Sequence, residues 1–374
     1  MSDTMLHLGM DVHKDSLTLA VLPADASAPT HVDRLPNDLQ KLRRYLARHA
    51  PVPAATRVCY EASGAGYVLQ RALTEWGYHC DVIAPSLIPK RPGVQRKHDR
   101  RDAVELARLY RAGELVVIRI PSAAEERVRD LVRCRETFQR EILKSRHYVL
   151  KFLARRGVVY RAGRHWTTAH ERWLRQVMAT STELGAEDRL VLGEYLALLD
   201  YKLQRRQELD RQLEQLVLAP ATATAVAWLQ CFRGIQRQSA LVLATEIVDW
   251  RRFENPRQLM AYLGLVPRER SSGDRERRGA ITKAGNTHCR HVLVQAAWAY
   301  RYRPLVSQHV KRRQEGQPAL VIAQAWKAQH RLHKVYTKLA VRRRPQIAVV
   351  AVARELAGFL WAVLREIEPM TAAA

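Results

Sequence analysis

The chain has 374 residues, enough for two or three domains with their own cores, and 47% of its residues are hydrophobic, which is typical of a globular protein. Its 62 lysines and arginines outnumber 37 acidic residues, and the resulting net charge of +25 indicates a polyanionic partner. We expect a reduced, cytoplasmic protein with no membrane partner, because the sequence shows no membrane-length apolar run, no signal peptide and no CxxC pair among its five cysteines.

The first 120 residues alternate strand and helix patterns. Alternating apolar residues over 7–23 predict two strands joined by a tight turn, with Asp11 inside the first strand. Further strands are predicted at 30–36, 57–63 and 79–85, and helices at 37–50, 66–78 and 99–113, the first of them capped by Asn37. A meander followed by alternating strands and helices favours a mixed α/β sheet.

The rest of the chain reads as mainly helical. Apolar residues at heptad spacing run from Val128 to Phe152 and again from Leu192 to Leu216, which predicts a long antiparallel helical hairpin or a coiled-coil arm, although an ordinary helical bundle fits as well. Between them, residues 155–176 are basic and aromatic, a composition that suits contact with unpaired bases. From residue 220 on, further helices surround a loop from Pro267 to Gly285 that is rich in arginine, serine and glycine.

Four carboxylates stand at positions where they could share a metal. Asp11 lies in the first strand, Glu61 ends a later strand, and Asp99 and Asp102 lie three residues apart at a helix start, which puts both on one face. Four converging carboxylates repel one another unless a divalent cation neutralises them, and paired Mg²⁺ ions (or Mn²⁺) suit phosphodiester chemistry. The alternatives are that Asp11 caps a turn and that the helical pair binds neighbouring arginines. The order of these acids along the chain looks like the RNase H-like, RuvC-type nuclease arrangement.

The loop that starts at Pro267 contains the second candidate site. Ser271 and Ser272 precede a glycine, and basic residues flank them on both sides: Arg268, Arg270, Arg275, Arg277, Arg278 and Lys283. Arginines bind phosphates in a bidentate manner and stabilise charge that develops at phosphorus. A serine hydroxyl is a poor nucleophile without a base or metal, so a flexible loop that only contacts phosphates remains an alternative reading of these residues.

Five sequence blocks resemble one known family. The blocks GMDVHKD, YEASGAG and KHDRRDA near the N-terminus, and YLGLVPRERSSG and GAITKAGNTHCRHVLVQAAW near the C-terminus, are similar to those of insertion-sequence transposases of the IS110 type, also called DEDD transposases and bridge-RNA-guided recombinases. The resemblance covers nearly the whole chain. It implies a RuvC-like, RNase H-like α/β domain over residues 1–120, a helical coiled-coil linker arm over 121–219, and a mostly helical C-terminal transposase domain over 220–374.

The resemblance also implies a chemistry and a set of partners. Asp11, Glu61, Asp99 and Asp102 become the metal-binding tetrad for Mg²⁺ or Mn²⁺, and Ser272 matches the nucleophile, with Ser271 as the adjacent alternative. The implied reaction is strand exchange between donor and target DNA, guided by a structured noncoding RNA that pairs with both. A homo-oligomer, from dimer to tetramer, would combine the tetrad and the serine loop of different protomers into composite active sites.

Two other functions fit some of the same residues. A metal-dependent nuclease or junction resolvase would use the tetrad with water and the serine loop as a DNA clamp, so it would cut DNA without a covalent adduct. A non-enzymatic nucleic-acid-binding protein would pair its acids with local arginines and would not cleave DNA. Both would bind less tightly as salt rises, so salt dependence does not distinguish them from a transposase.

Overall fold

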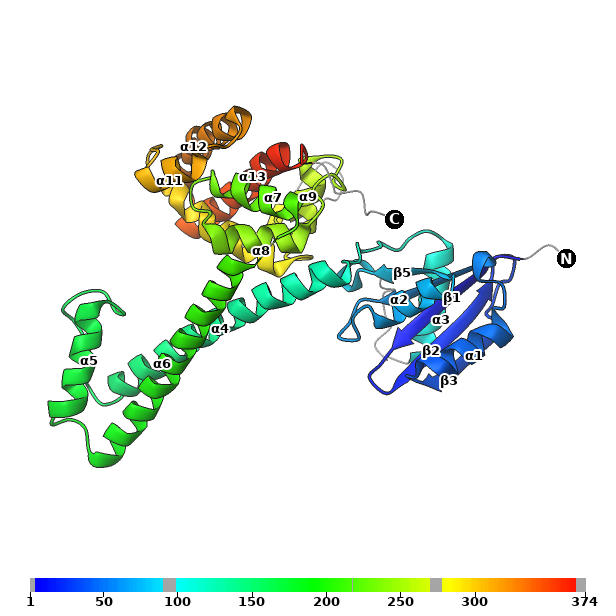
Figure 1. Cartoon of the computed structure of the whole chain (residues 1–374), viewed down its shortest axis with the longest axis horizontal. Coiled ribbons are helices and arrows are strands. Elements are labelled where there is room, and N and C mark those ends of the chain that lie inside the picture. Colours follow the sequence, from blue (N-terminus) through cyan, green and yellow to red (C-terminus); the bar gives the residue numbers. More distant parts are fainter. Residues whose placement is uncertain (1–3, 90–98, 217, 270–277, 368–374) are drawn as a thin grey trace. The chain divides into compact units, whose positions relative to one another are not determined.

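The computed structural model describes residues 4–89, 99–216, 218–269 and 278–367, and Figure 1 shows its elements. The chain separates into two compact units, Met1–Ser122 and Ala123–Ala374. The first unit contains a mixed sheet and the second is almost wholly helical, which confirms the predicted combination of an α/β part and a helical part. The three-domain division with a further boundary at residue 219 stays a prediction.

The first unit is built on a five-stranded sheet of order β3-β2-β1-β4-β5. Its strands are β1 (Leu6–Val12), β2 (Ser16–Pro23), β3 (His31–Pro36), β4 (Thr56–Glu61) and β5 (His79–Ile83). The first three form an antiparallel meander, and β4 and β5 extend the sheet in parallel from β1. The expected meander and mixed sheet are therefore confirmed.

Helices cover both faces of this sheet. They are α1 (Leu39–His49), α2 (Val68–Glu75) and α3 (Asp99–Arg111), with short 3₁₀ turns at Pro53–Ala55 and Pro85–Leu87. One face, with Met10 and Tyr60, packs in a core with side chains of α1 and α2, while α3 covers the other face. A Cβ on Gly9 of β1 would lie 2.3 Å from the carbonyl oxygen of Ala103, so only glycine lets α3 pack this close to the strand.

The start of α1 corrects one detail of the sequence prediction. Asp38, rather than Asn37, caps the helix, because its side chain accepts a hydrogen bond of 2.8 Å from the backbone N–H of Lys41. Asn37 donates from Nδ2 to the carbonyl oxygens of His13 (2.8 Å) and Lys14 (3.3 Å). Both residue types are good helix caps, so the sequence alone does not show that Asn37 is engaged in holding the β1–β2 turn.

The second unit begins with a pair of long helices. These are α4 (Ala123–Ala154) and α6 (Ala186–Gln215), separated by the shorter α5 (Thr168–Thr180). Arg135 pairs with Asp210 near one end, and Lys202 donates to Ser145 further along, so the two helices run antiparallel. Figure 1 shows the two helices crossing one another. The expected antiparallel hairpin is present, and a coiled-coil arm stays a prediction.

The remaining elements of the second unit form one large core. They are α7 (Pro220–Gln230), α8 (Arg237–Ile247), α9 (Pro256–Tyr262), β6 (Pro267–Glu269), β7 (Arg278–Ile281), α10 (Thr287–Ala297), a 3₁₀ turn at Trp298–Arg301, α11 (Gln308–Gln314), α12 (Ala319–Ala340) and α13 (Pro345–Leu364). The core is centred on buried residues such as Phe232, Trp250 and Tyr300.

Helix α13 reaches the length and hydropathy of a membrane span, whereas the sequence led us to expect no such segment. However, 50% of that stretch is buried, and its side chains belong to the large core. This burial indicates the core helix of a globular unit.

All five cysteines are free thiols; Cys59, Cys80, Cys231 and Cys289 are buried and Cys134 is exposed.

Candidate metal site and serine loop

The sheet places two of the predicted carboxylates, Asp11 and Glu61, at neighbouring positions on adjacent parallel strands. Met10 of β1 pairs with Tyr60 of β4, and Asp11 and Glu61 are the next residues on these parallel strands. Because side chains alternate along a strand, both carboxylates project to the face opposite Met10 and Tyr60. That face is the one covered by α3, where Cys59 contacts Leu106.

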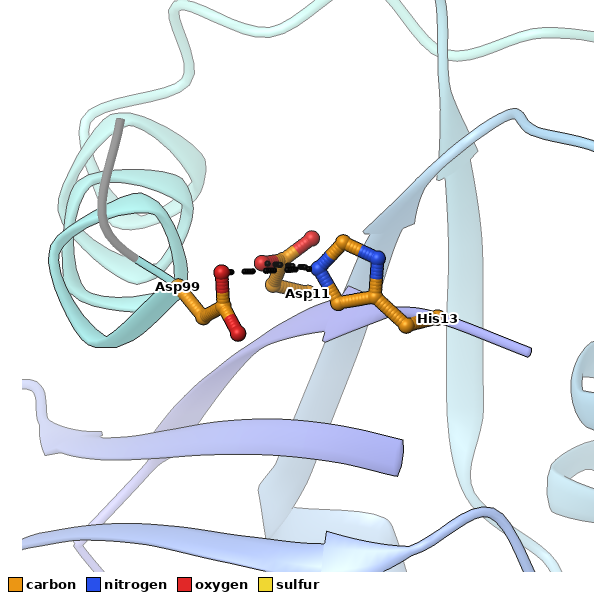
Figure 2. A group of neighbouring side chains, drawn as sticks. All are labelled: Asp11, His13 and Asp99. Atoms are coloured by element: carbon orange, nitrogen blue, oxygen red, sulfur yellow. Dashed lines mark hydrogen bonds and ion pairs between the residues drawn. The ribbon is translucent and has the colours of Figure 1, made fainter. Parts of the chain in front are cut away.

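Helix α3 brings two further carboxylates to this face. Asp99 and Asp102 lie in its first turn, where the helix dipole favours negative charge. Figure 2 shows that one imidazole nitrogen of His13 faces the carboxylates of both Asp11 and Asp99: its Nε2 is 3.2 Å from Oδ2 of Asp11 and 3.5 Å from Oδ1 of Asp99. The Asp11 side chain is 17% exposed and that of Asp99 is 39% exposed, so the group is open to solvent on the helix side.

This arrangement can hold a cation. The ligand atoms of Asp11, His13 and Asp99 all lie within 4.8 Å of one another. Two carboxylate oxygens suit Mg²⁺ or Mn²⁺, which complete their coordination with water, and a neutral imidazole is a more natural ligand of Mn²⁺ than of Mg²⁺. Without a cation, a protonated His13 would bridge the two acids as an ion pair.

The structure brings together only part of the predicted tetrad. Within the described part of the chain, Glu61 and Asp102 belong to the same face of the sheet and helix but not to the group within 4.8 Å. His13, by contrast, was not predicted. Its signal in the sequence is its position two residues after Asp11, which puts both side chains on one side of an extended chain. The four-carboxylate metal set stays a prediction.

The second candidate site starts from a short hairpin. The antiparallel strands β6 and β7 pair Pro267 with Ile281 and Glu269 with Arg278, where the sequence led us to expect only a loop. Strands of three and four residues without apolar alternation leave no pattern to detect. Ser271 and Ser272 lie outside the described residues, as do the predicted phosphate-binding residues Arg270, Arg275 and Arg277.

The other predicted phosphate-binding residues lie at the hairpin. Arg268 is exposed on β6, and its guanidinium donates to the carbonyl oxygen of Thr282 at 3.5 Å. Arg278 begins β7. Lys283 is exposed just beyond it, with its backbone N–H donating to the carbonyl oxygen of Gly264 at 3.1 Å. These cations are therefore placed on the two arms that carry the serine segment.

Two glycines fix the base of this hairpin. Gly264 has a φ of +63° and Gly285 a φ of +73°, and a Cβ on Gly285 would lie 2.0 Å from the carbonyl oxygen of Tyr262. The next residue, Asn286, donates its backbone N–H to that same carbonyl at 3.0 Å and caps α10 by accepting from the N–H of Cys289. The chain entering and the chain leaving the serine segment are thus held in direct backbone contact.

A buried carboxylate stabilises the base of the hairpin through hydrogen bonds. The side chain of Glu246 in α8 is 2% exposed; it accepts from Arg133 of α4 at 2.6 and 2.9 Å and from Nδ2 of Asn286 at 2.8 Å. Burial by itself raises the pKa of Glu246, but the hydrogen bonds and charge of Arg133, with the amide of Asn286, outweigh it and hold this pKa below its usual value. No sequence pattern indicates this network, because the partners of Glu246 lie 40 and 113 residues away along the chain.

Comparisons with known proteins match both regions. A family model described as "Transposase", of the DEDD type, matches residues 8–156, and a model described as "Transposase IS116/IS110/IS902 family" matches residues 226–311. The protein y4qE of Sinorhizobium fredii, named as a transposase, is 40% identical over 314 residues, which cover 84% of this chain and 76% of that protein. The transposase for insertion sequence element IS1533 of Leptospira borgpetersenii is 27% identical over 346 residues, covering 91% of this chain and 98% of the relative. The transposase for element IS1111A of Coxiella burnetii is 25% identical over 364 residues, covering 96% and 89%.

Proposed function

Because the chain belongs to the IS116/IS110/IS902 family of transposases, we propose that it moves an insertion sequence by RNA-guided strand exchange in which Ser272 attacks DNA phosphodiesters. Membership of the family makes the protein a DNA-recombining enzyme that binds DNA. The serine chemistry, the guide RNA and the oligomer are our extension of that activity. The observation that carries the proposal is the meeting of Asp11, His13 and Asp99 at the end of the sheet, where their ligand atoms lie within 4.8 Å of one another.

The first part of the proposal concerns the cation. Asp11 and Asp99 supply the ligands that already lie together, and Glu61 and Asp102 on the same face complete the set. A bound Mg²⁺ or Mn²⁺ would activate the serine hydroxyl or the scissile phosphate. His13, at 3.2 Å from Asp11, fixes the orientation of that carboxylate or shares the ligand set.

The second part concerns the covalent step. The Oγ atom of Ser272 forms a bond to phosphorus while the bond from phosphorus to the 3′ oxygen breaks. The proton lost from Oγ is matched by the proton that the departing 3′ oxygen takes up, so the products are a phosphoserine ester and a free 3′ hydroxyl. Attack by the 3′ hydroxyl of the exchanged strand then reverses the reaction and needs no ATP. Cationic side chains around the loop bind the phosphates: Arg268, Arg270, Arg275, Arg277, Arg278 and Lys283.

The third part concerns the assembly. Donor DNA, target DNA and a structured noncoding RNA are the proposed nucleic-acid partners, and the net charge of +25 supports binding to several polyanions. We propose that protomers form a dimer or tetramer in which the metal site of one protomer meets the serine loop of another. The proposed location is the cytoplasm, at the nucleoid.

The decisive experiment compares two adjacent serines. Protein, guide RNA and DNA carrying the element ends are incubated with Mg²⁺, denatured and resolved on a gel that separates protein–DNA adducts from free DNA. We expect the adduct and strand exchange to be lost in Ser272→Ala and retained in Ser271→Ala. The reverse result would move the nucleophile to Ser271, and DNA cleavage without any adduct would favour the water-using nuclease. Asp11→Asn is expected to abolish strand transfer while RNA binding persists.

A further inference from the structure

The end of the α4–α6 hairpin carries an uncompensated positive charge. We call residues 155–180, which comprise the segment after α4 and helix α5, the arm tip; residues 157–225 lie between the two stretches that family models match. The arm tip contains six arginines against one acidic residue, Glu171. This density of one charge sign exceeds what a solvated helix surface needs and indicates a polyanionic ligand.

The paired helices α4 and α6 differ from the arm tip in their ion pairs. Along α4 and α6 several cations pair with acids, among them Arg135 with Asp210, Lys202 with Glu141, and Arg211 with Glu208. At the arm tip, Arg156 alone has such a partner, Asp188. Among the described residues no hydrogen bond or ion pair engages the exposed side chains of the other five: Arg155, Arg161, Arg164, Arg172 and Arg175.

Aromatic rings accompany these cations. The imidazole of His170, which is fully buried, lies among rings whose centroids are 4.9 Å (Tyr160), 5.0 Å (Trp166) and 5.5 Å (Trp173) away. The three surrounding rings are only half-buried, so each keeps a surface for contact. Rings beside guanidinium groups are the usual means by which proteins stack unpaired bases and bind the adjoining phosphates.

The loop that carries the rings is preorganised. Trp166 adopts a φ of +61°, a conformation that costs a non-glycine residue free energy, and its backbone N–H donates to Nδ1 of His170 at 3.2 Å. The guanidinium of Arg146 lies 5.1 Å from the centre of the Trp166 ring, and the side chain of Thr167 caps α5. A strained residue held in place by several contacts is typical of a binding surface, because a rigid loop loses little entropy on binding.

We propose that the arm tip binds unpaired nucleotides of the guide RNA, with its free arginines on the phosphates and its aromatic rings stacked on bases. This inference rests on the RNA partner of the proposed function. Duplex DNA also offers phosphates, but its bases are stacked inside the helix, whereas loops of structured RNA present unstacked bases. The half-buried rings therefore favour RNA over duplex DNA as the ligand of this surface.

The test removes two charges without touching the aromatic cluster. Arg172→Gln with Arg175→Gln changes two exposed side chains one turn apart on α5, and Arg44→Gln with Arg48→Gln is the matched control on α1, also exposed and one turn apart. Full-length proteins are titrated with a labelled single-stranded RNA of about 16 nucleotides and with a duplex DNA of the same sequence. We expect the α5 variant to bind RNA with a salt slope smaller by about 1.4, two phosphate contacts at ~0.7 each.

Stacking is tested separately. We expect Trp166→Ala to weaken RNA binding about 5- to 150-fold and Trp166→Phe, which keeps a ring, to lose much less. Cross-linking of a 4-thiouridine RNA to the wild-type protein, followed by peptide mapping, should place adducts within residues 157–175. Thermal unfolding of every variant is compared with wild type, and the cross-linking result needs no variant at all.

The outcomes separate the inference from the proposed function. A wild-type protein that binds duplex DNA but no RNA would remove the RNA partner itself. A wild-type protein that binds RNA, with no cross-links at the arm tip and equal salt slopes for the α5 and α1 variants, would overturn only the arm-tip site. Equal loss of RNA and duplex DNA affinity in the α5 variant would overturn the preference for RNA, because the surface would then bind the phosphates of either nucleic acid.

Discussion

Replacing Glu246 by glutamine tests how the base of the serine hairpin is held. The two carboxylate oxygens accept three hydrogen bonds, two from Arg133 and one from Asn286. The glutamine side chain has only one oxygen, so in either orientation of its amide the NH₂ group faces a hydrogen-bond donor. The best orientation puts the amide oxygen where Arg133 Nη2 and Asn286 Nδ2 both donate, which leaves the amide NH₂ against Arg133 Nε, 2.6 Å from the atom it replaces.

The size of the expected stability loss follows from the burial of the Glu246 side chain. Losing one hydrogen bond to a charged group costs about 1.5–3 kcal/mol, and removing one partner of a buried ion pair costs about 3–5 kcal/mol. Arg133 is 41% exposed and can regain water, which lowers the second figure. We therefore expect Glu246→Gln to lower the free energy of unfolding by about 2–3 kcal/mol, or the melting temperature by about 4–12 °C.

The assay is calorimetric unfolding with a matched surface pair as control. Glu355→Gln removes the same bidentate chemistry from Arg331, but there the side chains are 27% and 57% exposed, so we expect a much smaller loss of stability than for Glu246→Gln. Equal losses in the two variants would refute the stabilising role of the buried network.

The same variant has a defined pH dependence. The pKa of Glu246 is lower in the folded protein than its usual value, so its contribution is complete above the unfolded pKa of about 4.3 and is lost as pH falls through the folded value. The difference in stability between wild type and Glu246→Gln should thus be full at pH 7 and should shrink below about pH 4. A difference that grows on acidification would mean that the carboxyl is destabilising.

Three further predictions follow from the geometry. Gly9→Ala should destabilise the first unit by about 3 kcal/mol or more in urea unfolding, because its Cβ overlaps backbone atoms of α3, whereas Gly64→Ala, with nothing within 4 Å, should be nearly silent. Gly285→Ala should cost clearly more than Gly316→Ala: both have positive φ (+73° and +72°), but only the first adds a 2.0 Å overlap, so equal losses would show that backbone strain alone matters. Mn²⁺ or Mg²⁺ at about 100 times its dissociation constant should stabilise the protein by about 2.7 kcal/mol, and this shift should vanish in Asp11→Asn but persist in Asp25→Asn, an exposed acid outside the site.

Sequence patterns predicted the first unit well because its strands carry period-two alternation over five or more residues. The placement of Asp11 and Glu61 at adjacent strand ends was within reach for the same reason. The spacing of carboxylates does not indicate His13, and strands of three or four residues such as β6 and β7 are too short to show a period. Glu246 is the one acidic residue of α8, and nothing in the sequence indicates its partners, which approach it only when α4, α8 and the start of α10 pack together.

The family resemblance contributed what periodicity could not. Spacing alone left Ser271 and Ser272 equivalent and left a phosphate-binding loop as an alternative, since both serines stand beside arginines and near a glycine. The transposase family is now established by the similarity to known members, whereas the assignment of Ser272 still depends on matching one motif.

The exposure of a single thiol has a practical consequence. Cys134 on α4 is the one exposed cysteine, while the other four are buried and burial raises the pKa of each of their thiols. Maleimide dyes react with the accessible thiolate, so the native chain should take one fluorophore at this helix without prior removal of cysteines. A second dye on the DNA would then report by energy transfer how far this helix lies from the bound nucleic acid.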